Sequence, residues 1–198
     1  MNLWWLRILF VSTMLTATTA AAEDDPDLSV KTSFESILVW LQSNAPELVD
    51  EFNPPAAEPE LAAFENRTGL MLPRTVRAAY AIHNGEKNTS QGIFGGWRWL
   101  PLDEVSTIRH NPTAYGIELA EAMIPVLVSG GGDYFYVEAA STPSEISEVI
   151  EWWHEDPVRD VKHVSFAAML KAFFNDLESG QYVYLPNEFV GLIDQDDL

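Results

Sequence analysis

The stretch Ser129-Gly-Gly-Gly-Asp-Tyr-Phe-Tyr-Val137 combines three consecutive glycines, an acidic residue and a short aromatic run. Glycines at the entrance of a strand allow backbone angles that are closed to other residues, or the close approach of another segment. The run after them predicts a β-strand with Tyr134 and Tyr136 on one face and Phe135 on the other, because strand side chains alternate. We therefore expect a turn at the glycines and a sheet strand directly after it.

Other short apolar runs in the middle of the chain predict further strands. They are set off by glycine, proline or charged turns and span residues 93–94, 97–102, 124–128 and 149–153. Residues 103–110 indicate one or two helical turns between two of them. Adjacent Trp152 and Trp153 must point to opposite faces of their strand, so one indole is exposed unless both faces are covered.

Helices are predicted on both sides of this strand region. Ser33 is a suitable cap for a first helix, whose apolar residues recur from Phe34 at helical spacing. A second helix starts near Pro59 and runs to Gly69, and a third is opened by Pro73 and ended by Gly85. The last helix follows Ser165, has a buried stripe at positions 166, 169, 170, 173 and 177, and stops at Gly180, before a closing strand over 181–185. Helices around a run of strands predict one α+β domain.

The composition is that of a globular protein with an unusual charge. The 198 residues are 47% hydrophobic, and 30 acidic against 11 basic residues give a net charge of −19. Such a surface repels phosphate backbones, so nucleic acid is not an expected partner, whereas a cationic protein is. The alternative is that the acidity only keeps the protein soluble. With no cysteine, the chain has no disulfide framework, thiol nucleophile or cysteine zinc site.

The N-terminus predicts a signal peptide over residues 1–22. Arg7 precedes a short apolar core, and Ala20-Ala-Ala22 ends in a cleavage pattern before an acidic run. The core is too short for a comfortable membrane-spanning helix of about 20 residues, although an uncleaved anchor is the main alternative. We expect export to the periplasm or the medium, no membrane insertion after cleavage, a flexible acidic leader over 23–32 and an acidic tail over 187–198.

Four segments in order give the chain a resemblance to the SUKH superfamily, which groups fungal cell-wall-assembly regulators with many bacterial immunity proteins. They are residues 54–73, the Ala79-Tyr-Ala-Ile-His-Asn-Gly85 turn, the Ile124 to Tyr136 strands with their Gly-Asp-aromatic motif, and residues 165–182. The match covers residues 33–186. It implies an α+β fold, with a curved, mainly antiparallel sheet flanked by helices, and no enzymatic activity.

The resemblance also implies a function. Many bacterial relatives are thought to bind and neutralise a toxin domain, often a nuclease. A signal peptide does not suit protection against a cytoplasmic nuclease, so we expect a basic toxin or effector domain that acts in the periplasm or envelope. An envelope or cell-wall assembly scaffold is the alternative.

Known catalytic and ligand motifs do not fit the chain. The run Gly130-Gly-Gly132 is followed by an aspartate and a strand, whereas a phosphate-binding loop opens a helix. Ser129 lacks the glycine two residues earlier that a nucleophile elbow requires. His154, with Glu155 and Asp156, is the best cluster for a hydrolase, and a solvated strand end explains it equally well. We predict no cofactor, no metal and no catalytic residue.

The remaining candidates for a working surface are aromatic. Exposed aromatic anchors beside acidic residues are typical of a protein interface steered by charge. The predicted partner-binding residues are Trp97, Trp99, Asp133, Tyr134 and Tyr136. The alternative for each tryptophan is a place in the core.

Overall fold

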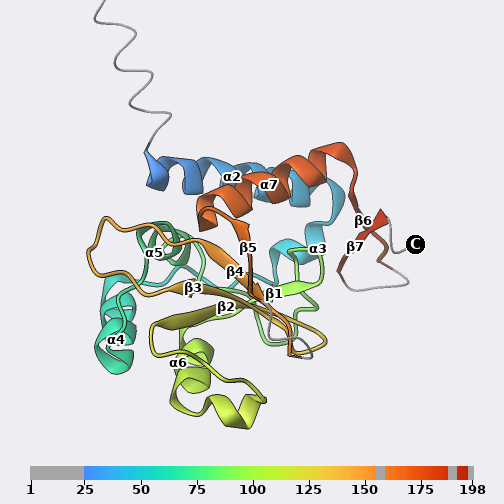
Figure 1. The fold of residues 1–198 in the computed structure, drawn as a ribbon. Coiled ribbons are helices and arrows are strands. Elements are labelled where there is room, and N and C mark those ends of the chain that lie inside the picture. The colour runs from blue at the N-terminus through green and yellow to red at the C-terminus, as the bar shows by residue number, and fades with distance from the viewer. Residues whose placement is uncertain (1–24, 155–158, 187–190, 196–198) are drawn as a thin grey trace, which may run out of the picture.

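An antiparallel sheet lies at the centre of the computed structural model, which describes residues 25–154, 159–186 and 191–195 (Figure 1). Its five strands are hydrogen-bonded in chain order: β1 (Trp97–Trp99), β2 (Met123–Ser129), β3 (Tyr134–Glu138), β4 (Val149–Trp152) and β5 (Arg159–His163). Every neighbouring pair is antiparallel, with register shifts between β2 and β3 and between β4 and β5. The predicted α+β class and the mainly antiparallel sheet are confirmed.

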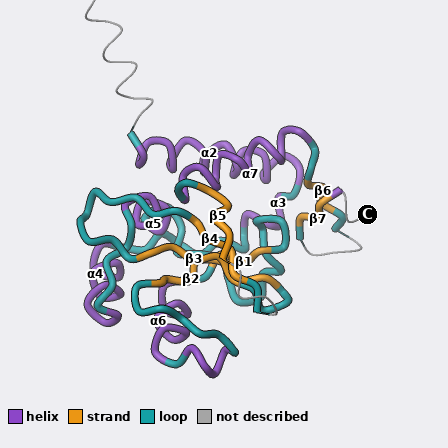
Figure 2. The backbone as a smooth tube through the Cα atoms, in the orientation of Figure 1, coloured by secondary structure: helices purple, strands orange, loops and turns teal. Residues whose placement is uncertain are grey.

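Helices cover both faces of this sheet, as Figures 1 and 2 show. Helices α2 (Pro26–Asn44) and α7 (Phe166–Ser179) pack side by side over one face. Helix α6 (Leu102–His110) lies on the other face and continues into the 3-10 helix η1 (Pro112–Tyr115). The remaining helices are α3 (Pro46–Val49), α4 (Glu58–Thr68) and α5 (Arg74–Tyr80). None of the helices within the described ranges is long and apolar enough to cross a membrane.

Helix α2 begins earlier than the sequence indicated. Asp25 is its cap, with a side-chain oxygen that accepts a hydrogen bond from the Asp27 N–H at 3.2 Å, and Pro26 takes the first helical position. Val30, four residues before Phe34, is fully buried and continues the apolar stripe by one turn. The expected start at Ser33 is therefore wrong, and residues 26–32 are helical instead of forming a flexible leader.

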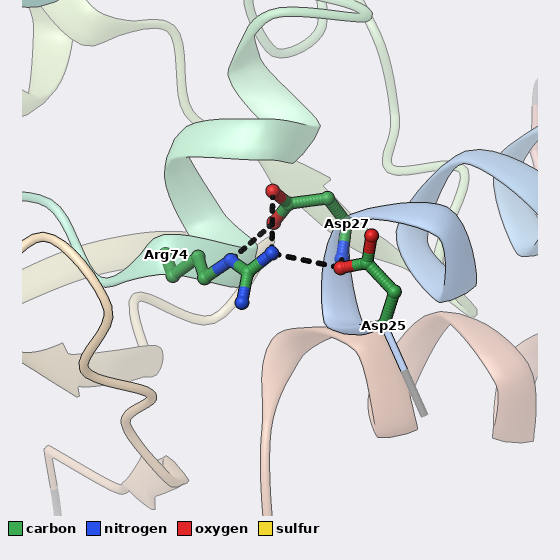
Figure 3. A network of polar contacts seen from close by, with 3 residues as sticks. All are labelled: Asp25, Asp27 and Arg74. Carbon is green, nitrogen blue, oxygen red and sulfur yellow. Dashed lines mark hydrogen bonds and ion pairs between the residues drawn. The ribbon is translucent and has the colours of Figure 1, made fainter. Parts of the chain in front are cut away.

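Arg74, at the start of α5, forms ion pairs with two aspartates at the start of α2 (Figure 3). Its Nη2 lies 2.7 Å from Asp25 Oδ1 and 3.0 Å from Asp27 Oδ2, and its Nε donates to Asp27 Oδ1 at 3.0 Å. The Arg74 backbone N–H donates to the carbonyl of Glu145 at 2.8 Å. One residue therefore joins two helices and the loop before β4.

Helix α7 matches its prediction closely. Ser165 caps it by accepting the Ala168 N–H at 3.0 Å, and Gly180 ends it with a left-handed φ of 78°. The predicted apolar stripe is buried from Phe166 to Leu177. The closing strand is also present as β6 (Tyr182–Tyr184), but it pairs with β7 (Leu192–Asp194), which lies in the segment expected to be an acidic tail.

The main core lies between the sheet and the pair of helices α2 and α7. Trp99 is completely buried there, and its ring centroid is 5.6 Å from that of Phe34, 5.1 Å from Tyr80 and 5.7 Å from Phe166. These residues come from β1, α2, α5 and the start of α7. A single indole of β1 thus contacts residues of α2, α5 and α7.

Two further predictions need correction, and one strand was not predicted. Residues 93–94 form no strand, and Phe94 makes only an isolated bridge to Trp97. Gly85 does not end α5, which stops at Tyr80. Instead, Gly85 has a φ of 68°, and a Cβ there would lie 2.6 Å from the backbone of Pro101, so glycine is required by both angle and space. Strand β5 was missed because its charged residues hide the apolar signal.

Candidate functional site

The β2–β3 turn is built around the hydroxyl of Ser129. Its Oγ accepts the N–H groups of Gly131 at 3.2 Å and Asp133 at 3.0 Å, and donates to Asp133 Oδ2 at 3.2 Å. Of the three glycines, only Gly132 has a positive φ, at 91°. A Cβ added at Gly130 would have no neighbouring atom within 4 Å, so close packing does not explain that glycine. The glycines shape a turn whose hydrogen bonds orient the side chain of Asp133.

Asp133 connects this turn to the end of β4. Its Oδ1 accepts the backbone N–H of His154 at 3.0 Å and lies 2.8 Å from the ring Nδ1 of the same residue. Burial raises the pKa of the Asp133 carboxyl, but the hydrogen bonds from His154 and Ser129 lower it more, so its pKa lies below the usual range. The carboxylate therefore stays charged at neutral pH and fixes the imidazole next to the turn.

The order of these contacts differs from that of a catalytic triad. In a triad the histidine lies between the serine and the acid, so that it can take the proton of the hydroxyl. Here the Ser129 hydroxyl donates to Asp133, and Asp133 lies between Ser129 and His154. Glu155 and Asp156, the other members of the predicted cluster, lie outside the described residues. Within the described residues, no group of three acidic or histidine side chains could hold a metal ion.

Two aromatic side chains stack beside this turn. The rings of Trp97 and Phe135 are parallel within 13°, with centroids 4.2 Å apart, and both residues are partly exposed. Trp97 pairs in register with Ser129, so the stack lies at the same end of the sheet as the turn. Trp153, which directly follows β4, is 53% exposed, while Trp152 is partly buried. One indole of the pair is thus exposed, as the alternation predicted.

We name the residues at this end of the sheet the sheet-end surface: Trp97, Asp133, Phe135, Trp153 and His154. Because neighbouring strands are antiparallel, β1 and β3 start at the same end of the sheet at which β2 and β4 finish. This brings these residues near one another. The surface combines a charged carboxylate with aromatic rings that solvent reaches. Such a combination suits contact with a partner that has both cationic and apolar groups.

Of the five predicted partner-binding residues, two are partly exposed and three are buried. Trp97 and Asp133 belong to the sheet-end surface. Trp99 is fully buried in the main core, and Tyr134 and Tyr136 are 4% and 2% exposed. The last two are stacked on the opposite face, with ring centroids 5.8 Å apart and Trp152 nearby. These three side chains have almost no surface for direct contact, and binding through Trp97 and Asp133 stays a prediction.

Glu86 was missed by the sequence reasoning, although it organises the approach to β1. It is fully buried, and its carboxylate accepts the Trp99 N–H at 2.8 Å, the Ile93 N–H at 3.1 Å and the Ser90 hydroxyl at 2.5 Å. Burial raises its pKa to about 7, against the opposing effect of these hydrogen bonds. Among thirty acidic residues, no local signal distinguished Glu86.

His83 and Asn84, which lie between α5 and β1, also stabilise this part of the chain. The Nδ1 of His83 lies 2.9 Å from the carbonyl of Asn53, and its ring stacks on Phe52 with centroids 5.0 Å apart. The side-chain oxygen of Asn84 accepts the Leu102 N–H at 3.0 Å. The His-Asn-Gly turn is therefore a structural junction, in which His83 packs on Phe52 and Asn84 binds the backbone of Leu102.

Part of this chain is similar to F-box only protein 3. The cow, human and rat proteins are each 31% identical to it over 67 residues, which is 34% of this chain. The aligned region spans only 14% of the length of those relatives. The similarity therefore concerns one segment of a much longer protein.

A family model matches a larger part of the chain. The model describes the SMI1 / KNR4 family (SUKH-1), and residues 55–172 match it. This range begins before α4 and ends within α7, so it includes the whole central sheet and the sheet-end surface. It also contains all but the terminal parts of the four segments that suggested the resemblance. Domains of this family are often immunity proteins and are generally not enzymes. The chain belongs to the SMI1/KNR4 (SUKH-1) family.

Proposed function

We propose that this chain is a non-enzymatic, immunity-type protein that binds and neutralises a basic toxin or effector domain. The observation that supports this most directly is the charge of the whole chain, which has 30 acidic residues against 11 basic ones. Charge of one sign raises the rate at which an oppositely charged partner meets the surface. Family membership favours protein binding over catalysis.

The sheet-end surface is the part of the molecule that we propose for the contact. Trp153 and the Trp97–Phe135 stack offer apolar area, and Asp133 holds a negative charge in a fixed position by its hydrogen bonds to Ser129 and His154. Aromatic anchors in rigid surroundings lose little conformational entropy on binding. The partner would place an apolar group among the rings and a cationic group near Asp133.

The predicted signal peptide sets the place of action. If residues 1–22 direct export, the partner acts in the periplasm, in the envelope or outside the cell. A toxin of the cytoplasm would not meet the exported protein. The target class is therefore a basic protein domain that damages an envelope component, or one that passes through the envelope.

A pull-down from the native envelope fraction tests this proposal. The tagged protein should capture a basic protein in stoichiometric amount at low salt, and less of it at high salt, because screening weakens attraction between exposed charges. Trp153→Ala should weaken capture, since truncation of a central anchor costs about 2 kcal/mol or more, about thirtyfold in affinity. Tyr115→Ala is the matched control, because Tyr115 is also an exposed aromatic residue, at 41%, but lies in η1.

Three results would decide against neutralisation of a toxin through this surface. Capture of envelope-assembly components alone would favour the alternative function of a scaffold or regulator. Capture that is equally reduced by Trp153→Ala and Tyr115→Ala would leave the sheet-end surface without a specific role. A growth defect of the deletion strain in the absence of any toxin would also favour the scaffold.

A further inference from the structure

The two edge strands of the central sheet, β1 and β5, differ in whether their outward backbone groups are hydrogen-bonded. At the β1 edge, Glu86 forms hydrogen bonds with both outward backbone groups of Trp99. The Glu86 backbone N–H donates to the Trp99 carbonyl at 2.7 Å, and the Glu86 carboxylate accepts the Trp99 N–H. At the other edge, no backbone hydrogen bond joins β5 to any described segment besides β4. Outward backbone groups of an uncovered edge strand are a template for pairing with another strand.

Strand β5 is also exposed through its side chains. Residues 159–162 are all exposed, and Val161 and Val164 are 52% and 71% exposed. Trp153 is 53% exposed, so three highly exposed large apolar side chains lie within the 12 residues from 153 to 164. Apolar groups beside an open strand edge are typical of a surface that another protein covers.

The order of charges along β5 specifies which strand could cover it. The sequence is Arg159-Asp-Val-Lys-His163, in which the acidic Asp160 directly precedes Val161 and the basic Lys162 directly follows it. If a second copy of β5 pairs antiparallel about a two-fold axis at Val161, Asp160 of each copy lies opposite Lys162 of the other. Directly opposite residues share a face, and opposite charges in such positions stabilise a sheet. We propose that β5 pairs with β5 of a second copy of this chain, which joins two central sheets into one.

The contacts within one chain are compatible with this register. Lys162 Nζ lies 2.6 Å from Glu151 Oε2, and Glu151 pairs in register with Asp160, so Lys162 and Asp160 lie on the same face of the sheet. Asp160 makes no ion pair with any residue that the structure describes. In the dimer, Lys162 would lie between Glu151 of its own chain and Asp160 of the other copy. Each lysine would then offset two carboxylates in a protein that is otherwise strongly acidic.

The oligomeric state of the full chain tests the proposal by sedimentation over a wide concentration range. A reversible dimer is expected, and Asp160→Lys should weaken it about tenfold or more, because both symmetric ion pairs become like-charge pairs at once. Glu118→Lys is the matched control: it changes the net charge equally at an exposed position in the loop after η1. Val161→Asp, which places two carboxylates at the two-fold axis, should dissociate the dimer as well.

Hydrogen exchange of the wild-type chain provides a test that needs no variant. Amide protection of residues 159–163 should rise with protein concentration, whereas that of β1 should not. A monomer at every concentration would overturn the proposal, and would mean that the charges and the register shift of β5 protect the edge from pairing. A dimer that Asp160→Lys and Glu118→Lys weaken equally would overturn it too.

Discussion

Glu86 offers a sharp test of how the fold closes around β1. Its carboxyl is fully buried and has a pKa raised from 4.5 to about 7, mainly by burial. Between these two pH values the folded protein keeps a proton that the unfolded chain has released. Folding therefore takes up a proton in this window, and stability falls as the pH rises from about 4.5 to 7. The stabilisation is complete below the lower value and is lost above the upper one.

Glu86→Gln isolates this contribution, because glutamine has the shape of the neutral carboxyl and does not titrate. From the two pKa values, the free energy of unfolding of the wild type should fall by roughly 2–3 kcal/mol more than that of Glu86→Gln between pH 5 and pH 8. Urea unfolding followed by tryptophan fluorescence at both pH values measures this difference. The comparison cancels the titration of the other acidic residues.

Glu86→Ala separates the hydrogen bonds from the charge. It leaves the N–H groups of Trp99 and Ile93 buried without their acceptor, at about 1–3 kcal/mol each, so at pH 5 it should cost about 4 kcal/mol. Glu86→Gln keeps one amide oxygen for Trp99 and should cost less. If the stability difference between wild type and Glu86→Gln were the same at pH 5 and pH 8, the Glu86 carboxyl would not have a raised pKa in the folded protein.

Three further predictions concern stability, each measured by urea or thermal unfolding. Ser165→Ala should cost about 1 kcal/mol through loss of the α7 cap, whereas Ser165→Asp should retain most of it; equal losses for both would contradict capping. Gly85→Ala should be among the most damaging single changes, because its Cβ would meet the backbone at Leu100 and Pro101 at a positive φ, whereas Gly69→Ala has only the φ penalty; equal effects would refute the role of close packing. Arg74→Met should lower the melting temperature more at low salt than at high salt, and a salt-independent loss would mean that packing and not charge joins α2 to α5.

Local signals in the sequence predicted much of the fold. Helix α7 was predicted correctly because Ser165 marks its start, Gly180 marks its end, and a regular apolar stripe lies between them. Strands β2, β3 and β4 were found by short apolar runs between turn residues. The start of α2 was missed although Asp25 and Pro26 are standard signals, because the acidic composition around them suggested a leader.

The candidate site was less predictable, because it depends on contacts between distant residues. Alternation assigned Tyr134 and Tyr136 to one face, but only the fold shows that both are buried there. Asp133 and His154 are 21 residues apart in sequence, and the antiparallel pairing of β3 with β4 brings them together. Glu86 could not be distinguished because its role depends on hydrogen bonds to the backbone of Ile93 and Trp99, which only the folded loop before β1 brings to its carboxylate.

The salt dependence of association with the captured basic partner is the most direct measurement of whether the acidic surface attracts that partner. Stopped-flow measurements should give an association rate that falls about tenfold or more from low to high ionic strength, and Trp153→Ala should mainly raise the dissociation rate. Steering by the acidic surface would account for the first effect and anchoring at the sheet-end surface for the second. An association rate that does not depend on salt, or a dissociation rate that Trp153→Ala leaves unchanged, would contradict neutralisation of a basic partner through this surface.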